Sequence, residues 1–321
     1  MPELQMTWGW MVAAYLFLGG IGAGSLIAAS VLRLASGRRF PNTVRFGAWA
    51  SMVAFAVGSF LLLLDVGVPL RAIVLFRSFV RFNSWMAIGA WLLFAGIGIG
   101  LLFALSTTRL TSDWIGTRWK WFGRNVESIQ RVFSIIGIPL GLGIGAYTGM
   151  LLSVLQFRPL WHTWVLPALF VLSALDTGLA LIMIYATTKE RAEGVERLHY
   201  FIEIGVVTIV PLEAIALAGF VLTALNGSAD AVLSAELLLH GPLSPYFWAL
   251  VVALGLGVPL LVCGTRLSGL AKDAPTLPII GAASCLTGGL ALRALVLLAG
   301  MPASLTSPAL AQFLNGVTFV P

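Results

Sequence analysis

WGWMVAAYLFLGGIGAGSLIAASVLRL, residues 8–34, is the stretch that decides the fold class of this chain. Its only charged side chain is Arg33, near the far end. A bilayer's hydrocarbon core is about 30 Å thick and needs roughly 20 helical residues at about 1.5 Å each. The stretch exceeds that length, is longer than a signal-peptide core and lacks a basic leader. We therefore expect a retained transmembrane helix.

Seven further apolar stretches follow, and the composition of the whole chain agrees with them. Hydrophobic residues make up 59% of the 321 residues, charged residues make up 10%, and the mean hydropathy is +0.97. The stretches are continuously apolar, whereas strands of a membrane barrel would alternate over about ten residues. We predict an all-α polytopic membrane protein, with one integral-membrane domain over residues 1–321. Its eight spans are expected near 8–34, 44–66, 85–106, 131–155, 163–186, 199–224, 245–264 and 276–299.

The basic residues predict the orientation of these spans. Fourteen of the 19 lie in or beside alternate connections, at 33–45, 109–131, 189–197 and 266–272. Cytoplasmic loops carry the excess of Lys and Arg in membrane proteins. We therefore expect these connections in the cytoplasm and both chain termini on the periplasmic side. The net charge of +6 is explained by topology, and no nucleic-acid partner is expected.

Three arginines are expected on the periplasmic side, within residues 69–83, where Leu, Ile, Val and Phe alternate with them. This mixture is typical of an amphipathic helix that lies in the membrane interface. Lipid phosphates and a docked partner protein suit its arginines equally well, because both accept hydrogen bonds from the same cations. The loop at 226–244 and the uncharged tail from Met301 are expected on the same side. The three segments could form one docking surface.

The few cysteines and histidines argue against several metal cofactors. A four-iron cluster usually takes four thiolates, but only Cys263 and Cys285 are present. Haem ligands would be expected within the spans, whereas His162, His199 and His240 fall in loops or at span ends. We expect no haem, iron–sulfur cluster or other metal site in this chain.

Glycine recurs along the predicted fourth span. Gly141, Gly145 and Gly149 are spaced four residues apart, so they share one face of a helix. Small residues on one face let two membrane helices approach closely. We therefore predict a helix–helix contact along this face.

Polar side chains within the spans are costly to bury and are the natural place to look for function. Counting about 1.5 Å per residue from the span ends places several of them at a similar depth in the periplasmic half. They could surround a small redox-active ring, or Arg293 could pair with Glu213 or Asp65 and brace the bundle. The set comprises Tyr15, Asp65, Tyr147, Glu213 and Arg293 in or at the ends of the spans, together with Arg158 and His162 in the short periplasmic turn between the fourth and fifth spans.

Two further carboxyls extend this set toward the cytoplasmic side. Asp176 lies in the middle of the fifth span, and Glu203 lies near the cytoplasmic end of the sixth. With Glu213 they could form a proton path. They could equally be isolated carboxyls, because helix positions 203 and 213 point roughly 80° apart.

Four sequence motifs resemble the NrfD/PsrC-type membrane subunits of nitrite, polysulfide and related respiratory oxidoreductases. The resemblance is good over about the first 190 residues and rests on helix number beyond them. Aromatic, glycine and proline positions match in order. The motifs are WGWMVAAYLFLGGIGAGS (8–25), LLLLDVGVPLRAIVLF (61–76), FNSWMAIGAWLLF (82–94) and AYTGMLLSVLQFRPLWHTWVLPALFVLSAL (146–175).

The resemblance implies a subunit without haem that exchanges electrons between a membrane quinone and an iron–sulfur subunit outside the membrane. Such a subunit commonly works with a molybdenum catalytic subunit that carries a bis-pterin cofactor. By motif, Tyr15 and Tyr147 match quinone-contacting positions, and Asp65 and Arg71 belong to the D-x-G-x-P-L-R pattern. Val68 departs from that pattern, since relatives often carry Arg or Lys there, and some relatives carry His at the position of Tyr15.

We therefore expect a quinone-interacting membrane anchor subunit of a respiratory oxidoreductase, in a bacterial or archaeal cytoplasmic membrane. Tyr15, Tyr147, Arg71, Arg158, His162 and Arg293 are the expected quinone-pocket residues, and Asp65 and Glu213 are the expected proton-exchanging residues. The quinone would be menaquinone or ubiquinone, and the iron–sulfur partner a periplasmic ferredoxin-like subunit with four-iron clusters. Two alternatives stay open: a secondary transporter, and a structural anchor without quinone chemistry.

Overall fold

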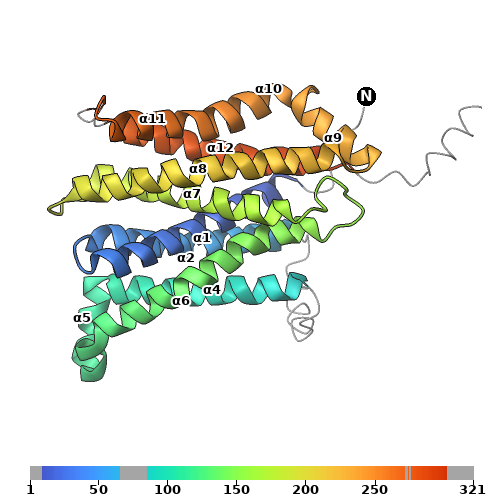
Figure 1. Cartoon of the computed structure of the whole chain (residues 1–321). Coiled ribbons are helices and arrows are strands. Elements are labelled where there is room, and N and C mark those ends of the chain that lie inside the picture. The colour runs from blue at the N-terminus through green and yellow to red at the C-terminus, as the bar shows by residue number, and fades with distance from the viewer. Residues whose placement is uncertain (1–8, 66–84, 272–273, 275, 302–321) are drawn as a thin grey trace, which may run out of the picture.

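The computed structural model describes residues 9–65, 85–271, 274 and 276–301, and these parts of the chain form helices joined by short connections (Figure 1). Within these described parts, eight helical segments are long and apolar enough to cross a membrane. They are α1 (Trp10–Ser36), α2 (Pro41–Asp65), α4 (Trp85–Thr107), α6 (Lys120–Ser153), α7 (Val165–Lys189), α8 (Val195–Leu225), the continuous segment of α10 (Ser244–Tyr246), η1 (Phe247–Gly257) and α11 (Val258–Leu267), and α12 (Leu277–Ala299).

These segments confirm the predicted all-α class and the eight spans, and most helix ends lie within a few residues of the expected ones. The exception is α6, which begins at Lys120 rather than near residue 131. Residues 120–130 are polar enough to fall outside an apolar stretch, but they continue the same helix. Two further helices occupy predicted loops, α5 (Arg109–Arg118) and α9 (Ala229–Leu239).

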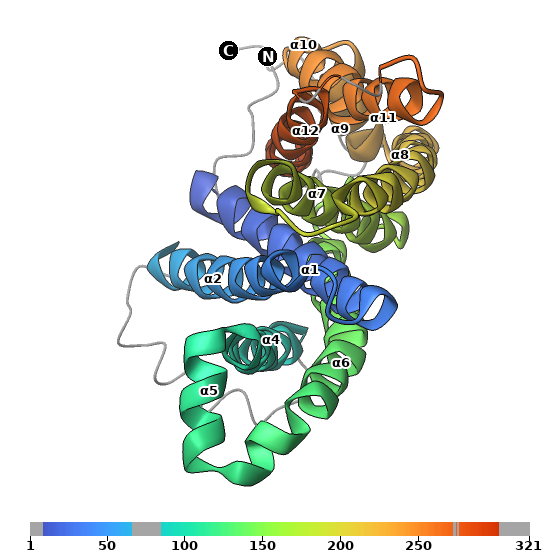
Figure 2. The same cartoon turned by 90° about the vertical axis from the view of Figure 1, so that its left-hand side faces the viewer.

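The eight spans are arranged as two rings of four. In the first ring α1 packs on α2, α2 on α4, α4 on α6, and α6 closes the ring on α1. In the second, α7 packs on α8, α8 on α11, α11 and η1 on α12, and α12 closes the ring on α7. The view along the helices shows the two groups side by side, with α1 and α7 between them (Figure 2). Because the two halves of the sequence share no convincing repeat, this division could not be predicted from it.

The two ends of the bundle differ. The C-terminal end of α12 lies beside the 154–164 connection and α9, since Trp161 Nε1 donates to the Val296 carbonyl at 2.7 Å and the Met301 amide donates to Ser234 Oγ at 3.4 Å. The links rich in Lys and Arg lie at the opposite end, on the left of Figure 1. We call this the basic end. That it faces the cytoplasm remains a prediction from its charge.

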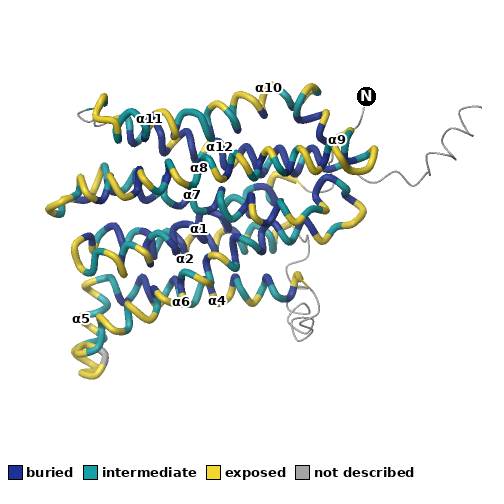
Figure 3. The backbone as a smooth tube through the Cα atoms, in the orientation of Figure 1, coloured by how far each residue is buried: buried dark blue, intermediate teal, exposed yellow. Residues whose placement is uncertain are grey.

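Burial follows the ring arrangement. The inward faces of the spans are buried and their outward faces are exposed (Figure 3). The two rings meet where the backbones of α1 and α7 approach closely. A Cβ added to Gly24 of α1 would lie 1.8 Å from the Ala174 carbonyl oxygen of α7. A Cβ added to Gly178 of α7 would lie 2.2 Å from the Gly24 carbonyl carbon. The predicted glycine face of α6 is also a contact face, because a Cβ on Gly149 would lie 2.4 Å from Pro167 Cα of α7.

A buried carboxylate holds the basic end of the two rings together. Glu190 follows α7 and is 5% exposed. Its Oε2 accepts hydrogen bonds from the Thr43 amide at 2.9 Å and the Thr43 hydroxyl at 2.8 Å, and its Oε1 accepts one from Asn42 Nδ2 at 3.3 Å. These groups belong to the first turn of α2, whose free amides and positive dipole end favour an anion.

Replacing Glu190 by alanine is expected to lower the free energy of unfolding by about 1–3 kcal/mol, because the buried Thr43 amide and hydroxyl lose their charged acceptor. Denaturant titration of the purified protein in detergent measures this loss. Glu193→Ala is the matched control, since Glu193 is exposed three residues away. Equal stabilities of the two variants would contradict the capping role of Glu190.

Several predicted features lie outside the described residues. These are the interfacial helix at 69–83, with Arg71, and the tail beyond Met301. The predicted leucine-rich run of the 226–244 loop is described and forms α9, whose first turn is capped by Ser228 Oγ accepting from the Ala231 amide at 3.4 Å.

Candidate functional site

Tyr15 and Tyr147 lie together inside the first ring. Tyr15 on α1 is fully buried, and Tyr147 on α6 is 3% exposed. The Tyr147 ring fills the space beside Gly89 of α4, where an added Cβ would lie 1.6 Å from Tyr147 Cζ. The Tyr15 ring packs against Gly58 of α2, because a Cβ added to Gly58 would lie 3.5 Å from Tyr15 Cδ2. Helices α1 and α6 carry the two phenols and α2 and α4 pack against them, and the phenols are close enough to interact electrostatically.

The two phenols lie at a similar depth, as the sequence predicted. Tyr15 is five residues from the start of α1 and Tyr147 six from the end of α6, which is about 8–9 Å from the end opposite the basic links. The buried Tyr15 hydroxyl has no hydrogen-bond partner among the described residues. Buried hydroxyls nearly always have one. The Tyr15 hydroxyl therefore has hydrogen-bonding capacity left for a ligand, with the Tyr147 phenol beside it.

Asp65 lies at the same end of the bundle as the tyrosine pair but does not touch it. It is the last residue of α2 and is exposed. Within the described part of the chain it makes no hydrogen bond or ion pair. The pairing of Asp65 with Arg293, one of the expected alternatives, is therefore not formed in this structure.

Arg158 and His162 lie in the 154–164 connection, where both bind carbonyl groups. Arg158 Nη1 donates to the Gly300 carbonyl after α12, and its guanidinium lies 5.3 Å from the centre of the Trp161 ring. His162 Nδ1 lies 2.8 Å from the Ser153 carbonyl at the end of α6. Burial lowers the pKa of the Arg158 guanidinium from its usual value, although it stays a cation at neutral pH. Arg158 thus fastens the connection to the end of α12 and His162 fastens it to the end of α6, and a role in a quinone pocket stays a prediction.

Arg293 lies between the two rings and is completely buried. Its Nη1 donates to Ser173 Oγ of α7 at 3.0 Å and to the Gly289 carbonyl at 2.8 Å. Gly20 of α1 leaves room for it, because a Cβ there would lie 2.4 Å from Nη2. Nε and Nη2 have no hydrogen-bond partner among the described residues. Such a cation in a membrane span is costly and is a candidate functional group.

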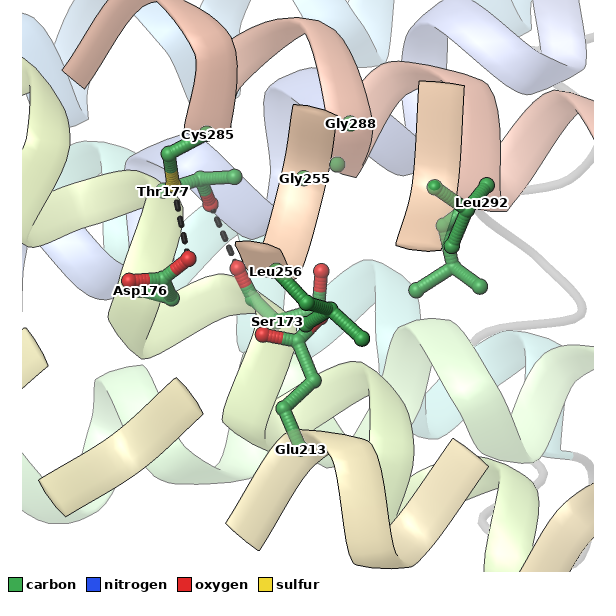
Figure 4. Close-up of a pocket in the computed structure, with 11 residues that line it drawn as sticks. Ser173, Asp176, Thr177, Glu213, Gly255, Leu256, Cys285, Gly288 and Leu292 are labelled. Carbon is green, nitrogen blue, oxygen red and sulfur yellow. Dashed lines mark hydrogen bonds between the residues drawn. The ribbon is translucent and has the colours of Figure 1, made fainter. Parts of the chain in front are cut away.

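Glu213 and Asp176 face a small cavity inside the second ring (Figure 4). Glu213 reaches in from α8 and is 5% exposed; Asp176 on α7 is 3% exposed. Cys285 Sγ of α12 donates to Asp176 Oδ2 at 2.7 Å, and Asp176 Oδ1 has no partner in the described structure. Ser173 and Thr177 complete the polar wall, and η1 supplies an apolar one. Glu213 is also close enough to Arg293 and Asp176 to feel their charges.

A second cavity continues from the first toward the basic end. Asp176 and Cys285 line both cavities, and Glu203, Arg266 and Cys263 line only the second. Glu203 Oε1 accepts from Arg266 Nε at 2.5 Å, and Arg266 Nη1 donates to the Ala274 carbonyl at 3.0 Å in the link to α12. The sequence placed Arg266 in a cytoplasmic connection. The structure instead shows it, with a side chain 10% exposed, as the partner of a buried carboxylate.

The three carboxyls follow one another along the bundle. Counted from the helix ends at the basic links, Glu203 lies about 12 Å deep, Asp176 about 20 Å and Glu213 about 27 Å. Glu203 and Glu213 do point in different directions, as their spacing on α8 predicted, but Asp176 on the neighbouring helix lies between them. The spacing of residues on α8 alone therefore does not indicate that Asp176 of α7 lies between the two glutamates.

The wide π-helix η1 forms one wall of the first cavity. Its eleven residues end just before Pro259, and the Val258 amide donates to the Ala253 carbonyl, five residues back. A proline clashes with the carbonyl four residues before it, so the wider turn accommodates Pro259. Gly255 and Gly288 then let η1 and α12 touch, since a Cβ on Gly288 would lie 2.1 Å from Gly255 Cα.

The polar residues expected around one ring-shaped ligand are thus divided between two places. The tyrosine pair lies inside the first ring, and Glu213 lies inside the second, with Arg293 between them. Among the described residues, no hydrogen bond or ion pair joins the tyrosine pair to Glu213 or to Arg293. Depth along each helix was predictable, but lateral position depends on which helices pack together. Cys285 and Ser173 were missed as site residues, although Ser173, Asp176 and Thr177 share one helix face by spacing alone.

Comparison with known proteins supports the resemblance noted in the sequence. The model of the family "Polysulphide reductase, NrfD" matches residues 2–303. A polysulfide reductase chain of Wolinella succinogenes is 28% identical over 314 residues, which cover 92% of this chain and 94% of that protein. Protein NrfD of Escherichia coli is 27% identical over 315 residues, covering 92% and 95%. A selenate reductase subunit of Mesobacillus selenatarsenatis is 23% identical over 203 residues, covering 55% and 47%. Because the family model spans nearly the whole chain, this protein belongs to the NrfD/polysulphide reductase family.

Proposed function

We propose that this protein is the quinone-reactive membrane subunit of an oxidoreductase complex in a bacterial or archaeal cytoplasmic membrane. It exchanges electrons between menaquinol or ubiquinol and a periplasmic ferredoxin-like subunit with four-iron clusters, which serves a molybdenum bis-pterin catalytic subunit. Family membership supports a subunit of a reductase complex, since relatives are named as parts of polysulfide and selenate reductases. The terminal substrate would be set by the catalytic partner.

One observation carries the quinone assignment: the buried phenols of Tyr15 and Tyr147 lie side by side, and among the described residues the Tyr15 hydroxyl makes no hydrogen bond of normal geometry. A quinone has two carbonyl oxygens that need donors, and a quinol has two hydroxyls that need acceptors; a phenol hydroxyl serves either need. The site lies about 8–9 Å inside the end that carries α9 and the 154–164 connection, which is close to a partner docked there. Asp65, exposed at the same end, is the proposed proton acceptor at the surface.

The carboxyl chain of the second ring completes the proposal. Oxidation of a quinol releases two electrons and two protons, and reduction of a quinone takes up the same numbers. Glu203, Asp176 and Glu213 line two cavities that share Asp176 and Cys285, and they form a stepped path from the basic end to the centre of the bundle. We assign them to proton transfer that accompanies quinone turnover. Arg293, between the rings, supplies positive charge that acts on Glu213 at the inner end of this path.

Replacing Tyr15 or Tyr147 by phenylalanine is expected to slow quinol oxidation by the purified complex by about tenfold to a hundredfold, because each variant loses one hydrogen-bonding hydroxyl and keeps its ring. Steady-state oxidation of a soluble quinol analogue measures the effect. Tyr200→Phe is the matched control, since Tyr200 is exposed on α8. A normal rate in Tyr15→Phe, Tyr147→Phe and the double variant would refute the site.

A secondary transporter remains the second candidate, because buried carboxyls beside small cavities are also the sites of ion transport. The two functions differ in their need for a redox partner. Proteoliposomes that hold this chain alone should show no solute or ion flux if the quinone proposal is right. Flux in the absence of quinol and of any partner subunit would favour the transporter.

A further inference from the structure

Helix α5 and the first turns of α6 form a hairpin across the basic end of the first ring. Both views show α5 running across the spans rather than along them, and reaching outward past α4 (Figures 1 and 2). Only Thr108 separates α5 from α4. The hairpin is tight, because a Cβ on Gly123 of α6 would lie 3.2 Å from Gly116 Cα of α5.

Hydrogen bonds fix the base of this hairpin to the ring. Thr111 Oγ1 donates to the Leu105 carbonyl at 2.6 Å, and Trp49 Nε1 of α2 donates to Thr108 Oγ1 at 3.0 Å. Gln130 Nε2 donates to the Ser106 carbonyl at 2.7 Å, while its Oε1 accepts from Arg33 Nε of α1 at 2.9 Å. The hairpin is therefore held at one level of the bundle, directly beyond the apolar span of α4.

The surface of the hairpin combines large apolar side chains with positive charge. Leu110 is 85% exposed, and Trp114, Trp119 and Trp121 are 65–69% exposed. Residues 109–131 contain five basic and two acidic residues, a net charge of +3. The ion pair of this segment joins Glu127 to Arg38 at 2.8 Å. Among the described residues, Arg118, Lys120 and Arg124 have no carboxylate within 4.0 Å.

We propose that this hairpin is a binding site for anionic phospholipid. Tryptophan is enriched where hydrocarbon meets head groups, and Lys and Arg beside such a surface bind phosphate. The hairpin has both, at the level where a spanning helix ends. The side of the hairpin that faces the membrane continues into the outer surface of α6, where Val132, Ile135 and Ile136 are 42–60% exposed. The acyl chains lie against this surface, and the head group lies among Arg118, Lys120 and Arg124.

Continuity with the span surface favours lipid over a partner protein as the occupant. A partner that bound from the water would leave the apolar faces of Val132 and Ile135 uncovered, whereas a phospholipid covers them and neutralises the basic residues at once. The proposal concerns the basic end and does not depend on the tyrosine pair or on redox function.

The test titrates the purified chain, in a neutral detergent, with fluorescent phosphatidylglycerol and, in parallel, with fluorescent phosphatidylcholine. Wild-type protein is expected to bind phosphatidylglycerol more tightly. The double variant Arg118→Gln, Lys120→Gln is expected to bind it more than tenfold more weakly, because each basic residue contributes about fivefold at an anionic surface. Arg191→Gln, Arg197→Gln is the matched control, in which two exposed basic residues are removed, one from the link between α7 and α8 and one from the first turn of α8, and less than a twofold change is expected.

Two further variants separate charge from packing. Arg118→Lys, Lys120→Arg keeps the charges and should keep the affinity for phosphatidylglycerol. Trp114→Ala, Trp121→Ala should weaken the binding of both lipids alike, because it removes the apolar contact. Equal affinities of the wild-type chain for the two lipids would overturn the proposal. An unchanged affinity of the Arg118→Gln, Lys120→Gln variant for phosphatidylglycerol would also overturn it. If that variant kept its lipid affinity but lost a co-purifying protein, the hairpin would be a protein-binding site instead.

Discussion

Gly178→Ala is expected to prevent the two rings from docking and to lower the yield of folded protein severely. The added Cβ would lie 2.2 Å from the Gly24 carbonyl carbon, 2.4 Å from Gly24 Cα and 2.6 Å from the Ser25 amide nitrogen, all of them backbone atoms of α1. A flexible side chain could move aside, but a helix backbone can only separate. We expect a loss of about 3 kcal/mol or more, at or above the upper end of the usual cost of overpacking.

The measurement compares the expression of monodisperse protein and its thermal unfolding in detergent. Gly98→Ala on α4 is the control, because a Cβ there has no atom within 4 Å outside its own helix. It should be neutral or stabilising by up to about 1 kcal/mol, the difference in helix propensity. A Gly178→Ala protein as stable as Gly98→Ala would mean that α1 and α7 do not pack as closely as described.

This contact also shows how far the sequence predicts the fold. Apolar length predicted eight spans, and the four-residue spacing of Gly141, Gly145 and Gly149 correctly indicated a contact face. Which helix meets that face is decided by shape, since Gly141 approaches α1 and Gly149 approaches α7. Gly24 and Gly178 lie in different spans without any shared motif. Hydrophobicity therefore predicts that a helix crosses the membrane but not its neighbours.

The candidate site was predictable in depth and not in lateral position. Counting residues placed Tyr15 and Tyr147 at one level, and the structure brings them together in the first ring. The same counting placed Glu213 beside them, although α8 belongs to the second ring. Arg266 was assigned to a loop because charge near a span end usually faces water, but a buried Glu203 holds it inside. Pairings between distant helices have no signature in a single sequence.

Asp176→Asn is expected to slow quinol oxidation by the complex about tenfold or more and to abolish the release of protons at the basic end. Asp176 and Cys285 are the residues that the two cavities share, so protons that pass between Glu203 and Glu213 meet this carboxyl. The amide oxygen of asparagine can still accept the Cys285 thiol, which binds Asp176 Oδ2 at 2.7 Å. Asparagine cannot accept and release a proton, however, so the fold is kept and the path is cut.

Proteoliposomes that contain the complex separate this effect from damage to the quinone site. A trapped pH dye follows proton release while quinol oxidation is recorded, and Asp113→Asn, exposed on α5, is the matched control. Tyr147→Phe should lower both rates in proportion, because it acts on the quinone itself. Asp176→Asn should lower the number of protons released at the basic end per electron more than it lowers electron transfer. If both quantities equal those of the control, Asp176 and Cys285 only join α7 to α12, and Asp65 at the other end of the bundle handles the protons of quinone turnover without the carboxyl path.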